Sequence, residues 1–330
     1  MATYKQIFGK QVKFLSADPP ASIGEGQIWY NSTTDTFKSS VVTGAWSSGG
    51  ALSNATHSSN SSFGSTPAGV MVGGTTPTGP ITANTELYDG TTWTANPNAC
   101  PFSIGYGTGG GTQTAGIVCS GENPPGSGTA TAKFDGSAWT SAPSRSTGTT
   151  TSVGIGSQSS FIQVAGVGVP APPYAALTVV ETFNGSAWAT ESNSYPVGFS
   201  QGFGGGTEAA AIIGGGDPGI TASNTWDGSA WTAAGAMLAS RYRGAYAGTS
   251  TNAYQIGGYN NPSGGHTDTT VFDGTTWGTN PSTATGSSGS AGAGQTGGVG
   301  GVIKMGGQYG TQLICEEFAE AVTVETITTS

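Results

Sequence analysis

A short motif, which consists of an aromatic residue, a turn and a tryptophan, occurs five times in this chain of 330 residues. Each copy has an aromatic residue, Asp-Gly or Asn-Gly, two small residues and a tryptophan, as in YDGTTW from Tyr88. The tryptophans are spaced 46, 49, 43 and 46 residues apart, and they are Trp93, Trp139, Trp188, Trp231 and Trp277. A recurring period of this length is typical of repeat architectures built from one supersecondary unit.

Each repeat carries signals for four short strands. A glycine-rich polar segment, a short polar turn and an apolar run that closes on glycine follow one another, as in residues 102–121. Apolar runs of this length between turn residues are typical of buried strands. Asp-Gly favours a tight hairpin, because both residues tolerate positive φ, and we expect the aromatic residue to lie opposite the tryptophan. Six segments end in such an aromatic residue, namely Tyr88, Phe134, Phe183, Trp226, Phe272 and Phe318.

Four-stranded sheets that repeat every 40–50 residues are typical of the blades of a β-propeller. One such sheet cannot bury both faces alone, whereas sheets that stack around an axis can. The sequence therefore predicts an all-β fold, a six-bladed β-propeller. The glycine pairs followed by an aromatic residue and a tryptophan resemble the kelch motif over roughly residues 46–318. The chain departs from that motif in its scarcity of Arg and in its compact Asp-Gly turn.

The sixth repeat lacks its tryptophan, because none follows Phe318, while Trp46 precedes the first repeat. The economical interpretation is that residues 41–46 supply the last strand of the sixth blade. The alternating segment 322–327, VTVETI, competes for the same place. We prefer Trp46, because it restores the missing aromatic residue. The expected domains are an arm over residues 1–40 and a propeller with strand-swapped closure over residues 41–330.

Charge and hydropathy exclude several classes of partner. Charged residues make up only 8% of the chain and its net charge is −9, although residues 1–38 carry a net charge of +1. No basic stripe is present, so we expect no binding to nucleic acid. No apolar segment is long enough to cross a bilayer, so we expect no membrane insertion. The solvent-facing surface must be rich in Ser, Thr, Asn and Gly.

No catalytic, cofactor or metal site is predicted. The Asp box of sialidases needs one residue between Asp and Gly, which are adjacent here. Copper-radical oxidases also use kelch propellers, but their ligand set of Tyr, His and Cys is not suggested by the two histidines, His57 and His266. The three cysteines Cys100, Cys119 and Cys315 have no metal-binding spacing and are expected to be small buried thiols. We therefore expect the protein not to be an enzyme.

The acidic residues have structural interpretations. Four of the five repeated turns begin with Asp, and Asn184 replaces it in the other one without breaking the pattern. Turn chemistry explains that exchange and catalysis does not. Glu86 and Glu181 precede the aromatic residue by two positions, and we expect them on a wet or inter-blade face of the strand.

Binding is expected on one face of the propeller. In an up-and-down blade, the connections between the second and third strands share one face with those between blades. These connections are long, dissimilar and rich in Pro, and they span residues 75–84, 122–130, 167–177, 217–223 and 259–268. Loops on a rigid scaffold often carry binding sites. The candidate ligand-binding residues are Tyr174, Tyr259, Asn260 and His266. The alternative is that the sequences of these surface loops have diverged without binding a ligand.

The first 38 residues contain no repeat. The stretch GEGQIWYNSTTDTFKSS predicts a hairpin, with strands at residues 27–30 and 36–38 around a polar turn. Its sequence, GQIWYN followed by FK, resembles the N-terminal segments of structural proteins of tailed phages of marine bacteria and cyanobacteria. In those proteins, such motifs precede kelch-like repeats. The resemblance implies a virion protein that is assembled in the host cytoplasm, with residues 1–40 docking to other virion proteins.

The expected function follows from that resemblance. The propeller would be presented on a tail fibre, a tail or a capsid surface and would attach to a host-surface glycan. The alternative is a decoration protein of the capsid or tail with a stabilising role, and a third possibility is a glycan-processing enzyme. The sequence leaves open whether the protein forms a homo-oligomer.

Overall fold

The computed structural model is all-β. It describes residues 13–19, 27–53, 61–76, 80–119, 121, 128–169, 175–260, 264–294, 301–307 and 313–328. The described part of the chain contains no helix, and so no helix with the length and apolarity needed to cross a bilayer. The chain divides into two compact units: unit 1 comprises Met1–Ala45 and Ala319–Ser330, and unit 2 comprises Trp46–Phe318.

This division differs from the expected boundary after residue 40. Residues 319–330 belong to the same unit as the N-terminal residues and not to the repeats. The reason is the pairing of two long strands, β3 (Thr36–Ser48) and β28 (Cys315–Thr326), which are neighbours in one sheet. Within unit 1, Lys38 Nζ donates a hydrogen bond to Thr326 Oγ1 (2.7 Å), and Ile327 N donates one to Phe37 O (2.9 Å).

Unit 2 contains five sheets of four antiparallel strands, and in each of them the order along the chain is the order in the sheet. The first two sheets consist of β4 (Ser61–Ser65), β5 (Ala68–Val72), β6 (Thr85–Tyr88) and β7 (Trp93–Asn96), and of β8 (Thr108–Thr112), β9 (Ala115–Cys119), β10 (Thr131–Phe134) and β11 (Trp139–Ala142). The third and fourth consist of β13 (Val153–Ser157), β14 (Ser160–Val164), β16 (Val180–Phe183) and β17 (Trp188–Thr190), and of β18 (Phe203–Thr207), β19 (Ala210–Gly214), β20 (Ser223–Trp226) and β21 (Trp231–Ala233). The fifth consists of β22 (Ala245–Thr249), β23 (Asn252–Ile256), β24 (Thr269–Phe272) and β25 (Trp277–Asn280).

The remaining strands of unit 2 are β26 (Ala291–Ala293) and β27 (Val302–Met305), which pair with each other and with the beginning of β28. Next to β28 in this sheet lies β3, whose Trp46 ring contacts Phe318 at 5.3 Å between centroids. A small additional ladder joins β12 (Thr149–Thr150) to β15 (Val167–Gly168).

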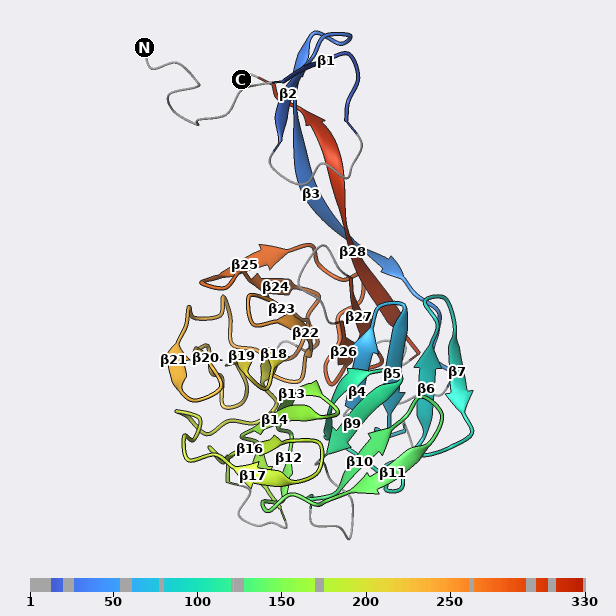
Figure 1. The fold of residues 1–330 in the computed structure, drawn as a ribbon, viewed down its shortest axis with the longest axis vertical. Coiled ribbons are helices and arrows are strands. Elements are labelled where there is room, and N and C mark those ends of the chain that lie inside the picture. Colours follow the sequence, from blue (N-terminus) through green and yellow to red (C-terminus); the bar gives the residue numbers. More distant parts are fainter. Residues whose placement is uncertain are drawn as a thin grey trace. The chain divides into compact units, whose positions relative to one another are not determined.

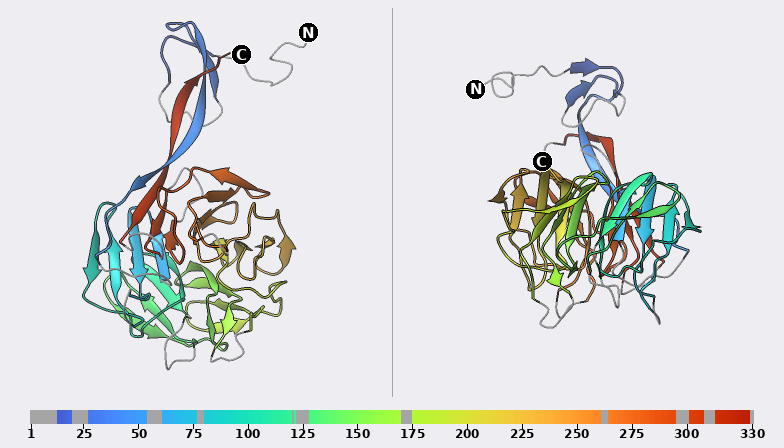
Figure 2. Two further views of the ribbon diagram at one scale, coloured as in Figure 1. Left: turned by 180° about the vertical axis from the view of Figure 1, so that it is seen from behind. Right: turned by 60° about the horizontal axis from the view of Figure 1, so that its bottom comes forward.

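The sheets of unit 2 have a propeller-like arrangement. Their first strands lie innermost, and each contacts the first strand of the next sheet, in the order β4, β8, β13, β18, β22 and β26. Strand β26 also contacts β4, so these contacts run around a common centre (Figure 1). Figure 2 shows the same sheets of unit 2 from two further sides. The cores lie between adjacent sheets, as where Phe63 of the first sheet packs with Phe134 of the second.

The repeated turns confirm the predicted hairpins. Phe134 pairs with Trp139, so four residues lie between the paired positions. Only the glycine adopts a positive φ, which is 99° at Gly136. The Asp135 carboxylate caps the turn by accepting hydrogen bonds from the backbone N–H groups of Ser137 (2.9 Å) and Ala138 (2.7 Å). The predicted Asp-Gly turn with positive φ at Gly136 is therefore confirmed, and the side chain of the Asp supplies the acceptor that closes the loop.

The tryptophan anchors lie against the aromatic residues of their own sheets and reach toward the preceding sheet. The ring of Trp139 lies 4.8 Å from that of Phe134, and its Nε1 donates to Thr85 Oγ1 in the first sheet (2.9 Å). Trp188 makes the same contact with Thr131 (3.1 Å). Trp93 and Trp277 are buried, whereas Trp46, Trp139, Trp188 and Trp231 are only partly buried.

Unit 1 contains the predicted hairpin, formed by β2 (Ile28–Asn31) and the first residues of β3. A strand that the sequence did not predict, β1 (Lys13–Leu15), pairs in parallel with β2. Trp29 is buried, and its Nε1 donates to Asp18 Oδ1 (3.0 Å). On the opposite face, Tyr30 lies between Phe14 and Phe37, at 5.2 and 5.3 Å between ring centroids.

Candidate binding site

A cavity of about 140 Å³ lies where the first strands of the sheets of unit 2 meet. The five four-stranded sheets and the sheet that contains β26 contribute to its wall, through residues of β4, β8, β13, β18, β22 and β26. Glycine and serine dominate the lining, because the innermost strands are the glycine-rich segments of the repeats. The cavity is therefore walled largely by backbone, with few large side chains. It is smaller than the roughly 300–1,000 Å³ of a drug-sized site.

The rim of this cavity is formed, in five of the sheets, by the residue two positions before the first strand. Four of these rim residues, Tyr106, Thr151, Gln201 and Arg243, have left-handed backbone conformations with φ between 57° and 59°. The equivalent residue of the next sheet is Gly289, with φ of 69°. Left-handed φ is uncommon for any residue with a side chain and is a genuine outlier for a β-branched one such as Thr. Four side chains are thus kept at positions that glycine would occupy without strain.

A chain of backbone hydrogen bonds joins the rim residues of successive sheets. Each rim residue donates its N–H to the carbonyl of the rim residue before it. The bonds run from Thr151 to Tyr106 (2.8 Å), from Gln201 to Thr151 (2.7 Å), from Arg243 to Gln201 (3.1 Å) and from Gly289 to Arg243 (2.5 Å). These bonds fix the rim residues relative to one another, so the mouth of the cavity is held by main chain.

Arg243 gives the rim a positive charge. Its Nε donates to Gln201 Oε1 (3.0 Å), which orients the guanidinium along the rim. None of the described residues that line the cavity is Asp or Glu, and no carboxylate of the described chain lies within 4 Å of Arg243. The basic residues Arg145, Arg241 and Lys304 of unit 2 each pair with a carboxylate, whereas Lys133 donates to the carbonyl of Gly185.

Tyr246 crosses the interior of the cavity. It belongs to β22 of the fifth sheet, and its hydroxyl lies 3.2 Å from Thr108 Oγ1 of the second sheet. The backbone N–H of Gly154 also donates to the Tyr246 hydroxyl (3.5 Å). Removal from bulk water raises the pKa of Tyr246, so the phenol stays neutral. This side chain limits how far a ligand can enter between the sheets.

Three of the predicted ligand-binding residues come together beside this rim. His266 Nε2 lies 2.6 Å from Asn260 Oδ1, and Tyr259 forms a β-bridge with Gly265, next to His266. Tyr259 also bridges Tyr242, and the two rings meet edge to face at 5.2 Å. Tyr242 is the residue directly before Arg243, so the predicted cluster adjoins the cavity rim. The fourth predicted residue, Tyr174, lies outside the described residues.

The same connection between loop and rim recurs in two other sheets. Thr150, which precedes the rim residue Thr151, pairs with Val167, and Ser200, which precedes Gln201, bridges Asp217. In each case the partner comes from the long loop between the second and third strands. The long loops are thus attached to the segment that carries the rim.

His266 is half-buried beside the ion pair of Asp268 and Arg241. Its Nδ1 lies 3.6 Å from Asp268 Oδ1, and Asp268 in turn pairs with Arg241 Nη2 (3.2 Å). Burial, followed by the positive charge of Arg241, lowers the pKa of His266 below its ordinary value, and the Asp268 carboxylate only partly offsets this. The imidazole is therefore neutral at pH 7, when it can accept as well as donate a hydrogen bond.

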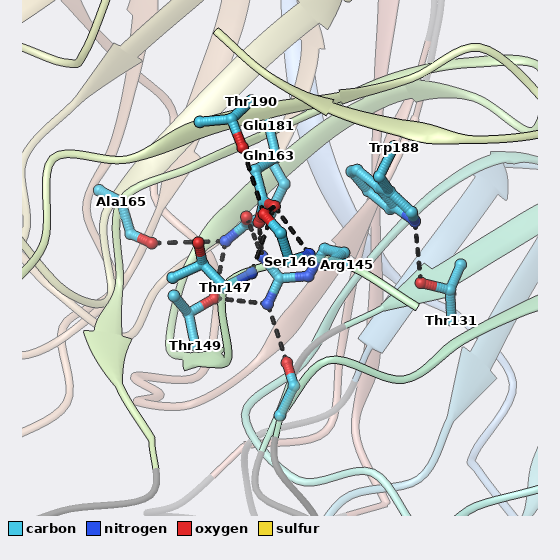
Figure 3. A network of polar contacts seen from close by, with 11 residues as sticks. Thr131, Arg145, Ser146, Thr147, Thr149, Gln163, Ala165, Glu181, Trp188 and Thr190 are labelled. Atoms are coloured by element: carbon cyan, nitrogen blue, oxygen red, sulfur yellow. Dashed lines mark hydrogen bonds and ion pairs between the residues drawn. The ribbon is translucent and has the colours of Figure 1, made fainter. Parts of the chain in front are cut away.

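Buried polar residues fix the segments that lead to the rim. Glu181 accepts a hydrogen bond from Arg145 Nη1 (2.9 Å) and from the backbone N–H of Ser146 (3.0 Å), and both charged side chains are fully buried (Figure 3). Gln163 also accepts from Arg145 and donates to Thr149 (3.0 Å). This network holds residues 145–149 immediately before Thr151.

Three other sheets have an equivalent contact at the second residue of the third strand. That residue binds the segment before the first strand of its own sheet, through the pairs Glu86 with Ser53, Asn224 with Tyr195, and Glu316 with Ala284. Glu86 and Glu181 are buried, which overturns the expectation of a wet face and leaves the inter-blade alternative standing. The cause is the polar backbone of the connecting segment, which needs a buried acceptor.

The other candidate chemistry of the chain is structural. Cys100, Cys119 and Cys315 are free and buried, as expected for small core thiols. Among the described residues, no group of three His, Cys, Asp or Glu side chains could hold a metal ion. His57 lies outside the described residues.

No protein-family model matches this chain, and no curated protein matches it.

The rim residues were missed in the sequence because they share no residue type from one repeat to the next. A weak signal does exist, since a bulky or polar residue precedes glycine at Tyr106, Gln201 and Arg243. Only the left-handed φ values and the bonds between sheets show that these positions are equivalent.

Proposed function

We propose that this chain is a structural protein of a tailed-phage virion whose unit 2 attaches to a glycan on the host surface. The observation that carries the proposal is the fixed rim of the cavity, to which the long loops with Tyr259 and His266 are joined. A small polar cavity whose rim residues are fixed by backbone hydrogen bonds suits the binding of a ligand without catalysis. The resemblance of the sequence of residues 26–38 to structural proteins of tailed phages supports the location in a virion.

The proposal includes a six-bladed kelch-like propeller that residues 41–46 close. Three contacts support closure by this segment. Trp46 lies against Phe318 at 5.3 Å, as each other tryptophan lies against the aromatic residue of its repeat. Strand β26 contacts both β22 and β4. Trp93 and Cys315 pack in one core cluster, and Cys315 is the first residue of β28 as Thr85 and Thr131 are the first residues of β6 and β10.

The proposed docking arm is the N-terminal part of unit 1. Its aromatic cluster is exposed to solvent, with 74% of Phe14 and 46% of Phe37 accessible. Exposed aromatic side chains that pack on one another are typical of protein interfaces. We propose that this cluster contacts another virion protein.

Binding of the purified protein to host cells tests the attachment function. Wild-type protein should bind the cells and compete with phage adsorption, and Tyr259→Ala should weaken both effects. Ser159→Ala, in the short turn between β13 and β14 at the other end of β14 from the long loop 167–177, is the control and should behave as wild type. Glycan arrays identify the ligand.

The outcome also separates the alternative function. If the protein binds no host cell or glycan but binds purified capsids or tails, and Phe14→Ser reduces that binding, the decoration role is the better one. Release of reducing sugar from host envelope would instead show a glycan-processing enzyme.

A further inference from the structure

We propose that the cavity of unit 2 binds the carboxylate of an acidic monosaccharide unit, with Arg243 as the anion-binding residue. The inference deepens the proposed attachment function and rests on it for the biological context.

The charge of the lining selects the ligand. A guanidinium is a planar fork that pairs with a carboxylate through two parallel hydrogen bonds. Gln201 uses the Nε of Arg243, and the described residues provide no carboxylate within 4 Å for the other two nitrogens. Among the described residues of the lining, Arg243 is thus a cation without a carboxylate partner, in a chain whose net charge is −9. An anionic group is the partner that this arrangement lacks.

The remaining lining suits a sugar body. Serine hydroxyls and backbone groups of the innermost strands line the wall, among them Ser61, Ser62 and Ser290. These groups can donate to and accept from the hydroxyls of a sugar ring. Tyr106 adds an aromatic face and a phenol at the rim. A volume of about 140 Å³, closed across its interior by Tyr246, limits the ligand to one sugar unit, such as the end or a branch of a glycan.

The backbone of the rim supports a binding role. Tyr106, Thr151, Gln201 and Arg243 keep side chains at left-handed φ values, and Gly289 shows that the same fold accepts glycine at this position. Residues held in sparsely populated conformations cluster at ligand sites, because the surrounding structure maintains them. The strain at these four positions is explained if their side chains are needed.

The strain also provides a precise test. Arg243→Gly removes the guanidinium and places glycine where φ is 59°, so the backbone bonds of the rim can remain and the fold should be at least as stable. Ala165→Gly is the matched control, because Ala165 has the same φ of 59° and does not line the cavity. Arg243→Lys keeps the charge without the fork.

The probes are galacturonate, galactose and inorganic phosphate, titrated into the whole protein and followed by NMR and calorimetry. We expect galacturonate to bind wild type and Ala165→Gly alike, and to bind Arg243→Gly at least about tenfold more weakly. Galactose should bind weakly to all three. Arg243→Lys should lie between wild type and Arg243→Gly. Unchanged Tm values confirm that the variants are folded.

Three results would overturn the inference: no binding of galacturonate to wild type, equal binding by Arg243→Gly, or galactose binding as tightly as galacturonate. If phosphate binds more tightly than galacturonate and depends on Arg243, the site recognises a phosphate group and the carboxylate assignment is wrong. Host-cell binding that survives Arg243→Gly would leave the attachment function standing and remove the cavity from it. Galacturonate binding without host-cell binding would leave the cavity site standing and remove the attachment function.

Discussion

The Asp and Asn residues of the repeated turns act through their side-chain oxygen. In all five turns, one oxygen of this side chain accepts two backbone N–H groups, as Asp89 does from Thr91 (2.8 Å) and Thr92 (2.7 Å). Asn184 makes the same two bonds without a charge, from Ser186 (3.0 Å) and Ala187 (2.9 Å). The geometry of the turn therefore requires an acceptor, and the charge is an addition to it.

Acid should weaken the Asp turns and spare the Asn turn. The backbone N–H groups of Thr92 and then Thr91 lower the pKa of Asp89 from 3.8 to about 2. A depressed folded-state pKa means that the stabilisation is present above pH 3.8 and is lost as the pH falls toward 2. Asp89→Asn should therefore reduce the loss of stability between these pH values. Thermal melts at pH 2 and pH 6 measure the effect, and a loss that is the same in both proteins would contradict it.

The buried thiols should be unreactive in the folded protein. Burial raises the pKa of Cys100 and of Cys315 to about 12, so neither forms a thiolate at pH 8. We expect no reaction with a disulfide reagent in buffer and three equivalents of thiol after unfolding in guanidinium. Rapid labelling of the native protein would show that the sheets around these residues open readily.

At the scale of the element, the third strand of a sheet does more than pair with its neighbours. Its second residue points a buried polar group at the segment that enters the same sheet, as Glu181 does toward Arg145 and Ser146. This contact links the sheet to the connection that carries the rim residue Thr151. The rim is thus positioned by side chains of the strands as well as by its own backbone bonds.

The ion pair of Arg145 and Glu181 gives an element-scale prediction. Arg145→Met leaves the Glu181 carboxylate buried without its counter-charge, and it should lower the free energy of unfolding by about 3–5 kcal/mol. The double variant Arg145→Met/Glu181→Gln removes both charges and keeps an acceptor for Ser146. It should lose less than the single variant. Urea unfolding measures both, and a double variant less stable than the single one would contradict this explanation.

At the scale of the whole molecule, the proposed closure joins the two ends of the repeat array. Strand β3 lies beside β28, and Trp46 supplies the aromatic contact that the sixth repeat lacks in its own sequence. A sheet of unit 2 without this strand would expose the backbone edge of β28.

Two deletions test the closure. Removal of residues 1–48 takes away the whole of β3, and we expect a lower Tm and self-association through the exposed edge. Removal of residues 1–35 keeps β3, and unit 2 should melt as in the full chain. Calorimetry and light scattering compare the two proteins. Equal melting of both would show that residues 41–46 are not part of the closing sheet.

Local patterns in the sequence were enough to predict the repeat. The period of the tryptophans, the glycine-ended apolar runs and the Asp-Gly turns predicted four strands per repeat, and five four-stranded sheets confirm them. The aromatic residue and the tryptophan do face each other across the hairpin, as Phe134 and Trp139 show. These features follow from propensities of neighbouring residues, which a sequence displays directly.

Only the tertiary structure decided which positions of different repeats meet. The cavity, the bonds from Arg243 to Gln201 and from Gln201 to Thr151, and the burial of Glu181 all depend on contacts between residues distant in the chain. No local period marks the rim residues, because their shared property is a left-handed φ imposed by the neighbouring sheet and not a shared residue type. A sequence records the strands that a repeat forms, whereas the arrangement of the repeats around one centre creates the site.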